Sequence, residues 1–161
     1  MGTRRLSWPL ALLALLAALA SANAGVAAGR WLDVWRAFDN LRITLTGIEV
    51  ADDESAVLVR LRLENGSGRT LRLSFARAGL WLNGRSLTAG EVSLGQVELP
   101  PGGRYDLELR ANVYAELRDY LRRERESGRL SWRVEGEVRL RVGELTDWVL
   151  VPYWAVWETG A

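Results

Sequence analysis

Hydrophobic and polar residues alternate along most of the chain from residue 41 onward. The alternation is clearest over residues 56–75, where two alternating runs flank the polar segment Asn-Gly-Ser-Gly at 65–68. A period of two places aliphatic side chains on one face of a pleated strand and arginines on the other, so one face meets a core and the other meets water. The pattern predicts one wall of a β-sandwich, with two strands joined by a tight turn at 65–68.

Similar patterns predict the remaining strands, at 41–50, 79–82, 86–94, 105–110, 130–142 and 145–157. The phase of the alternation shifts at Gly47, which predicts a bulge or bend. The dipeptide Asn83-Gly84 suits a two-residue type I′ turn, and Pro-Pro-Gly-Gly at 100–103 predicts a break between strands. The last run is apolar on both faces, which predicts a central strand, while Pro152 predicts a bulge or an exposed edge within it.

One helix is predicted within this β-rich region, over residues 112–126. Asn112 can cap its start, and Gly128 can end it in the left-handed conformation. The run Arg-Arg-Glu-Arg at 122–125 fits either a solvated helix face or a phosphate contact. The apolar face is narrow, as in a surface helix, and consists of Val113, Leu117, Tyr120 and Leu121.

The N-terminus has the pattern of a targeting segment, with two arginines, an apolar run over 6–20 and small residues over 21–24. Residues 1–24 are therefore predicted to be a signal peptide or an N-terminal membrane anchor. The apolar, Ala-rich character continues to Ala28, long enough to span a bilayer if Ala24 is not a cleavage site. Both cases predict an extracytoplasmic protein, either secreted or anchored to the cytoplasmic membrane. A buried core helix in a cytoplasmic protein would instead carry a polar stripe, and this segment has none.

Residues 25–40 are predicted to be a short amphipathic linker helix, followed by a single sandwich domain at 41–158. Trp31, Trp35 and Phe38 are spaced i, i+4 and i+7, with charged residues between them. This aromatic stripe can pack against the domain, or it can lie in the bilayer interface, where Trp is favoured.

The composition limits the chemistry. With 161 residues and 48% hydrophobic content, the chain can build one domain with a full core. Its 21 basic residues are all Arg and nearly balance 20 acidic residues, so no basic field for nucleic acid is expected. Cys and His are absent, which excludes thiol nucleophiles, imidazole bases, disulfides and His/Cys metal sites, and no cofactor is predicted. The use of Arg in place of Lys fits a thermophile or simply a GC-rich genome.

Two acidic groups remain as candidates for chemistry. Residues 52–55, Asp-Asp-Glu-Ser, lack the ligand spacing of a calcium loop, so a solvated turn is expected there. Glu135 and Glu137 share one strand face about 7 Å apart, as acid and base catalysis would need. The flanking arginines Arg133, Arg139 and Arg141 would lower both pKa values and keep both carboxylates ionised, which favours surface ion pairing over an enzyme.

The C-terminal half is rich in tryptophan, which raises the possibility of an aromatic binding patch. Such a patch could contact glycan, lipid or protein partners, although a sandwich core also takes such rings readily. The candidates for the patch are Trp81, Trp148, Trp154 and Trp157.

Several short motifs occur in a fixed order between residues 41 and 157. They are Leu-Arg-Leu-Glu-Asn at 61–65, Leu-Trp-Leu-Asn-Gly at 80–84, Leu-Pro-Pro-Gly at 99–102, an alternating strand with Gly136 at 132–138, and Val-Pro-Tyr at 151–153. In this order and spacing the chain resembles the late embryogenesis abundant group 2 family, whose shared module is the water stress and hypersensitive response domain. One departure is that Asn65 is followed by Gly-Ser, where the family usually has Pro-Asn.

The resemblance implies a fibronectin type III-like or immunoglobulin-like antiparallel β-sandwich with one surface helix and no enzymatic activity. It also implies a role in tolerance of desiccation or other stress. We therefore expect a non-enzymatic extracytoplasmic protein that protects or binds client macromolecules. The alternative is a binding or assembly module of the cell envelope that uses exposed aromatic residues.

Overall fold

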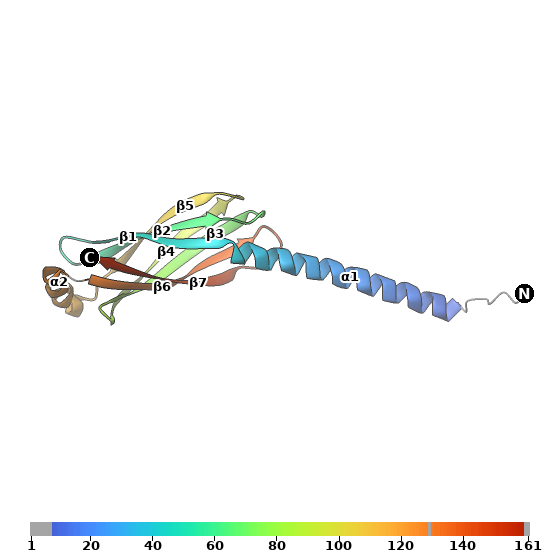
Figure 1. The fold of residues 1–161 in the computed structure, drawn as a ribbon, viewed down its shortest axis with the longest axis horizontal. Coiled ribbons are helices and arrows are strands. Elements are labelled where there is room, and N and C mark those ends of the chain that lie inside the picture. The colour runs from blue at the N-terminus through green and yellow to red at the C-terminus, as the bar shows by residue number, and fades with distance from the viewer. Residues whose placement is uncertain (1–7, 129, 160–161) are drawn as a thin grey trace, which may run out of the picture.

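The alternating segments form two antiparallel β-sheets packed face to face, with a long helix leaving one end (Figure 1). The computed structural model describes residues 8–128 and 130–159. The first sheet has the order β1-β2-β5 and comprises β1 (Leu41–Val50), β2 (Ala56–Asn65) and β5 (Arg104–Asn112). The second has the order β4-β3-β6-β7 and comprises β3 (Leu71–Leu82), β4 (Arg85–Leu99), β6 (Leu130–Val142) and β7 (Val149–Thr159). This mainly β sandwich confirms the predicted fibronectin-like fold class.

The core lies between the two sheets and is built from the residues that alternation pointed inward. Trp132 is the largest fully buried side chain, at 1% exposure. Burial of each such aliphatic or aromatic side chain stabilises the fold by roughly 1.5–3 kcal/mol. The most central rows are fully buried and consist of Val57, Val59, Leu61 and Leu63 from β2, Leu71, Leu73, Leu80 and Leu82 from β3, and Val134, Val138 and Leu140 from β6.

The predicted hairpin at 65–68 is wrong, because β2 and β3 belong to different sheets. β2 pairs with β1 and β5, while β3 pairs with β4 and β6. The segment between them therefore crosses from one sheet to the other over the end of the core. Alternation identifies each strand from local sequence, but it does not identify the strand's partner.

Asn65 holds this crossing together from a buried position, at 1% exposure. Its side-chain amide donates hydrogen bonds to the carbonyl oxygens of Arg69 at 2.8 Å, Leu99 at 2.9 Å and Pro100 at 3.1 Å. Its side-chain oxygen accepts from the Ser67 amide at 3.0 Å and the Ser67 hydroxyl at 2.6 Å. One side chain thus joins the end of β2, the β2–β3 connection and the turn that leads from β4 to β5.

Three turn predictions are confirmed. Asn83 and Gly84 alone separate β3 from β4, and both have positive φ, 47° and 83°, as a type I′ turn requires. The register between β1 and β2 shifts between Leu45 and Gly47, which is the expected irregularity. The Pro-Pro-Gly-Gly segment separates β4 from β5, and this connection also crosses between the sheets.

The surface helix begins later than predicted. Asn112 is the last residue of β5, paired with Ala56, so it does not cap a helix. A short 3₁₀ turn, η1 (Ala115–Leu117), leads into α2 (Arg118–Ser127), which ends at Gly128 in the left-handed conformation, as expected. The predicted apolar face does meet the core, with Val113, Leu117 and Leu121 buried and Tyr120 packed against them.

The acidic turn between β1 and β2 fastens α2 to the sandwich. Glu54 has positive φ, 54°, and is only 8% exposed. Its carboxylate lies 3.3 Å from the Arg122 guanidinium and 3.4 Å from that of Arg125. Ser55 donates a backbone hydrogen bond to Asp53 at 3.1 Å, and bonds from Ser55 lower the pKa of that carboxyl. The turn is therefore only partly the solvated segment that was expected.

The last strand lies at an edge of its sheet, so its prediction as a central strand is wrong. β7 pairs only with β6, and Pro152 lies on it without a shift of register. The expected edge exposure is confirmed, whereas the alternative of a bulge is not. The prediction assumed that apolar residues on both sides of the strand are buried. On the outward side of β7, however, Trp154 is 75% and Val156 is 53% exposed.

Tyr153 ties this edge strand to the middle of the sheet. It points inward, opposite Gly136 of β6, and its hydroxyl donates a hydrogen bond to the Arg77 carbonyl oxygen at 3.0 Å. Burial raises the pKa of the Tyr153 phenol. A Cβ atom at Gly136 would come within 2.6 Å of the Tyr153 ring and would collide with the Arg77 carbonyl oxygen, so only glycine fits there.

The N-terminal helix, α1 (Trp8–Asp39), runs without a break through both predicted N-terminal segments. Figure 1 shows it projecting from the end of the sandwich opposite α2. The division at 24 and 25 remains a prediction. The packing expected of the aromatic stripe is only partly correct: Phe38 packs against the core with Val34 and Ala37, whereas Trp31 and Trp35 are 64% and 54% exposed.

Replacing Asn65 with Ala should lower the free energy of unfolding by roughly 2–4 kcal/mol, because buried carbonyl groups lose their donor. Urea unfolding followed by fluorescence would measure the change. Asn40→Ala is the matched control, since that side chain makes an exposed hydrogen bond to the Arg36 carbonyl oxygen at 2.8 Å. Equal losses for the two variants would contradict the role assigned to Asn65.

Tyr153→Phe should lower the free energy of unfolding by about 1 kcal/mol at neutral pH, by loss of one hydrogen bond. Above pH 10 the unfolded wild type loses the phenolic proton that the folded state retains. Wild-type stability should then fall faster than that of the variant, by about 1.4 kcal/mol per pH unit, until the folded-state pKa is reached. Stability curves that run parallel from pH 9 to 12 would contradict this. Tyr114→Phe, at a 52% exposed tyrosine, should leave stability at neutral pH unchanged.

Candidate functional site

A broad open groove of about 1500 Å³ lies on the outer face of the four-stranded sheet and reaches toward β5. We call it the outer groove. Its central side chains come from β3, β6 and β7 and are Arg77, Trp81, Arg133, Glu135, Glu137 and Trp154.

The floor of the outer groove is formed where a glycine leaves room for an aromatic ring. Gly79, Glu135 and Trp154 lie in one row across β3, β6 and β7. A Cβ atom on Gly79 would lie 3.0 Å from the Trp81 ring, so the indole of Trp81 lies against this glycine. The Arg133 guanidinium is 5.7 Å from the centre of the Trp81 ring, a cation–π distance.

The charged groups of the groove are balanced. Glu137 pairs across strands with Arg77 at 2.6 Å, and Glu135 contacts Arg133 on its own strand, which confirms the expected surface ion pairing. Glu91 and Arg110 also line the groove. The lining therefore contains three arginines and three glutamates, and it has no net charge.

Of the four predicted tryptophans, the structure brings two together. Trp81 and Trp154 both line the outer groove. Trp157 lies on the inward side of β7, where it is half-buried, pairs with Trp132 and packs against the core.

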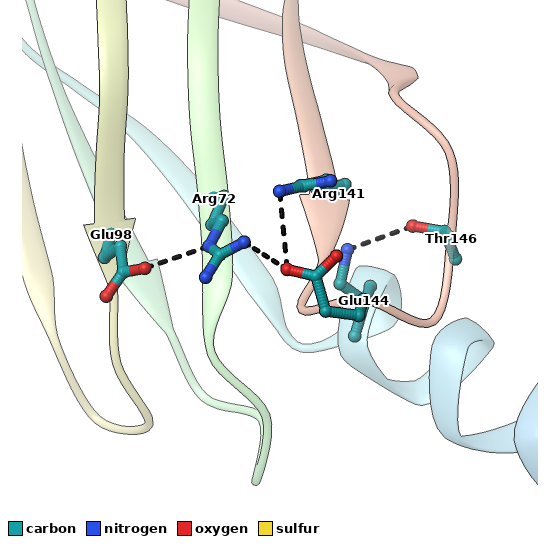
Figure 2. A network of polar contacts seen from close by, with 6 residues as sticks. Arg72, Glu98, Arg141, Glu144 and Thr146 are labelled. Carbon is teal, nitrogen blue, oxygen red and sulfur yellow. Dashed lines mark hydrogen bonds and ion pairs between the residues drawn. The ribbon is translucent and has the colours of Figure 1, made fainter.

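Trp148 lies at the end of the sandwich from which α1 leaves. Arg139 and Arg141 approach its ring at 5.7 Å and 5.2 Å. Figure 2 shows the polar network that holds this β6–β7 connection in place. Arg72 binds Glu98 at 2.9 Å and also contacts Glu144, and Arg141 reaches Glu144 at 3.5 Å.

This network offsets the repulsion between two arginines. Arg72 and Arg141 stand directly opposite each other on β3 and β6, an arrangement that is destabilising for like charges. Glu98 and Glu144 place a carboxylate on each side of Arg72, and the Thr146 hydroxyl accepts a hydrogen bond from the Val142 amide at 3.0 Å. The connection is therefore fixed by contacts within the protein, and Trp148 is separate from the outer groove.

Three of the acidic candidates, Glu54, Glu135 and Glu137, have arginine partners. Glu135 and Glu137 contact Arg133 and Arg77, and Glu54 contacts two arginines of α2. Arg122 and Arg125 are thus engaged by a carboxylate of the protein itself. Within residues 8–128 and 130–159, no group of three or more acidic, His or Cys side chains could hold a metal ion.

The sequence did not identify Arg77, Gly79 or Arg110 as part of a site. The spacing of Gly79 and Trp81 was a usable signal, because a glycine two residues from an aromatic residue on a strand face leaves space for the ring. No sequence signal places Arg110, since it reaches the groove from the other sheet.

Comparisons with known proteins give similarity at the level of fold. No protein family model matches the sequence, and no curated protein matches it either. The solution structure of At1g01470 from Arabidopsis thaliana is similar with a TM-score of 0.54 at 12% identity, covering 74% of this chain and 80% of that chain. Identity at this level shows a shared fold and nothing finer.

Two further structures have lower scores. A protein from Archaeoglobus fulgidus has a TM-score of 0.49 at 15% identity, covering 75% of this chain and 94% of its own. The candidate late embryogenesis abundant protein At2g46140.1 has a TM-score of 0.45 at 12% identity, covering 91% of this chain and 86% of its own. These two scores are too low to support a conclusion. The chain thus shares its β-sandwich fold with At1g01470.

Proposed function

We propose that this protein is a non-enzymatic β-sandwich that works outside the cytoplasm while α1 tethers it to a membrane. The observation that carries the proposal is an apolar helix that the protein itself does not cover. By length and composition α1 is able to cross a membrane, and none of its apolar window is buried. Residues 12–29 extend about 27 Å at the helical rise, close to the ~30 Å hydrocarbon core of a bilayer.

The end of α1 near the sandwich fits a membrane interface. Arg30 is the first charged residue after the apolar stretch, and the exposed Trp31 and Trp35 follow it. Tryptophan is enriched at the level of the lipid headgroups, where its ring and its N–H group both find partners. A cleaved signal peptide passes the same length and composition test. The mature N-terminus distinguishes the two cases.

The tether predicts that the full chain stays in the membrane pellet after an alkaline carbonate wash and keeps its N-terminal segment by mass. Replacing Leu15 and Leu16 with Arg should release the chain, because each Arg near a helix centre costs roughly 2.5–3.5 kcal/mol on insertion. The matched control replaces the same two residues with Ile, which keeps the segment apolar. A mature mass that begins at Gly25 would contradict the tether and identify a free exported protein.

A protective role under stress is the function that we assign to the tethered domain. It is supported by the ordered motifs that resemble the late embryogenesis abundant group 2 family. One of these motifs ends at Asn65, whose side chain joins three segments. The carboxylates considered for catalysis, Glu54, Glu135 and Glu137, contact arginines, which also suits a protein that binds clients rather than transforms them.

The full chain in lipid nanodiscs should reduce the aggregation of a heat-labile client enzyme on heating or drying. Light scattering and recovered client activity would measure the effect, with empty nanodiscs as the control. No reduction at stoichiometric excess would contradict the protective role.

A second candidate function is a binding module of the cell envelope. The specific observation in its favour is Trp154, which is 75% exposed beside paired arginines and glutamates in the outer groove. Such a module could act with or without a role in stress.

A further inference from the structure

We propose that the outer groove binds a neutral glycan chain, with Trp154 as the ring on which a sugar stacks. The proposal rests on the binding function just described, and it depends on neither the tether nor the protective role.

The exposure of Trp154 has no explanation within the fold. Its exposed fraction of 75% is the highest of the large hydrophobic residues in the described part of the chain. The ring lies on the outward side of an edge strand, where it adds little buried apolar area to the sandwich. A large aromatic ring left in water beside polar groups is typical of a recognition surface.

The second ring lies at a useful distance. The Trp81 ring lies against Gly79, which shares a row with Trp154 two strands away, so the strand spacing places Gly79 and Trp154 about 10 Å apart. That separation corresponds to the length of a disaccharide unit. A sugar presents an apolar C–H face that can stack on an indole, while its hydroxyl groups point outward at the ring edge.

Hydrogen-bonding groups lie between the two aromatic rings. Glu135 shares a row with Trp154, and Arg133 lies over the ring of Trp81. The side chains of Arg133 and Glu135 are 62% and 34% exposed, so both retain contact with solvent. A carboxylate accepts several hydrogen bonds and a guanidinium donates up to five, so both can bind sugar hydroxyls while they contact each other.

The charge balance favours a neutral occupant. Nucleic acids and anionic lipid surfaces are bound through an excess of Lys or Arg. The outer groove has three arginines and three glutamates among its lining residues, so it offers no such excess. Paired charges with free hydrogen-bonding capacity suit a ligand that is polar and uncharged.

The site is also largely rigid before a ligand arrives. Its side chains stand on three hydrogen-bonded strands, and the Tyr153 hydroxyl fixes the backbone of β7 to the carbonyl oxygen of Arg77 at 3.0 Å. Binding to a preformed surface avoids the entropic cost of ordering loops.

Isothermal titration calorimetry of the full chain in detergent would test the proposal, with hexa-N-acetylchitohexaose, cellohexaose and maltohexaose as neutral probes and heparin as the anionic probe. We expect saturable binding of at least one neutral oligosaccharide and weaker binding of heparin. Trp154→Ala should weaken the neutral binding roughly tenfold or more. Trp154→Phe should restore most of the affinity, because a ring remains for stacking.

Trp148→Ala is the matched control, because it removes a tryptophan of the β6–β7 connection that lies outside the groove. Its affinity should match that of the wild type, and circular dichroism would verify that each variant is folded. Absence of saturable binding to all three sugars would overturn the proposal. Tighter binding of heparin, or an affinity that Trp154→Ala leaves unchanged, would overturn it as well. The last result would place the sugar site elsewhere on the protein.

Discussion

The contact between the apolar faces of β2 and β3 is the constraint on which the rest of the structure depends. Each strand lies inside its sheet, and the inward rows of both are fully buried. Because consecutive strands face each other rather than pair, the chain between them must cross the end of the core. Backbone polar groups at such a crossing need partners. Asn65 supplies them from a single side chain, at distances of 2.8–3.1 Å.

Once the core is closed, the two outer faces of the sandwich are free to differ. On the three-stranded sheet, Arg60 binds Glu49 at 2.6 Å and Glu108 at 3.1 Å, and Arg62 binds Asp106 at 2.8 Å. The bond from Arg62 lowers the pKa of Asp106, so this face stays ionised and hydrated. The four-stranded sheet instead has a glycine floor, two aromatic rings and an open groove. The second face is therefore the one for which we propose a binding function.

Sequence reasoning located each strand of the described residues, because alternation is a local property of the side chains, although it divided β3 into two strands at 71–75 and 79–82. It failed where the answer depended on distant parts of the chain. The strand pairing of β2 and β3, the edge position of β7 and the true start of α2 all follow from tertiary contacts. Residues 145–157 are apolar on both sides in the sequence, but Trp154 and Val156 face solvent.

The candidate site illustrates the same limit on prediction. Tryptophan content suggested an aromatic patch, yet the four candidates separate into three environments. Trp81 and Trp154 share the groove, Trp157 packs on the core, and Trp148 has two arginines near its ring. Which tryptophans meet is decided by strand order and register, and the sequence of one strand contains neither.

The junction between α1 and the sandwich connects the fold to its proposed setting. Arg69 of the β2–β3 connection binds Asp33 of α1 at 2.6 Å, and the Gly66 amide bonds to the Asn40 carbonyl oxygen at 2.9 Å. Asp33 lies about 6 Å along the helix from Gly29, the last residue before the charged turns. A bilayer around α1 would therefore place this end of the sandwich among the lipid headgroups. Arg77 lies six residues into β3 from that end, about 20 Å along the strand, so the outer groove would face partners some 20 Å beyond the headgroups.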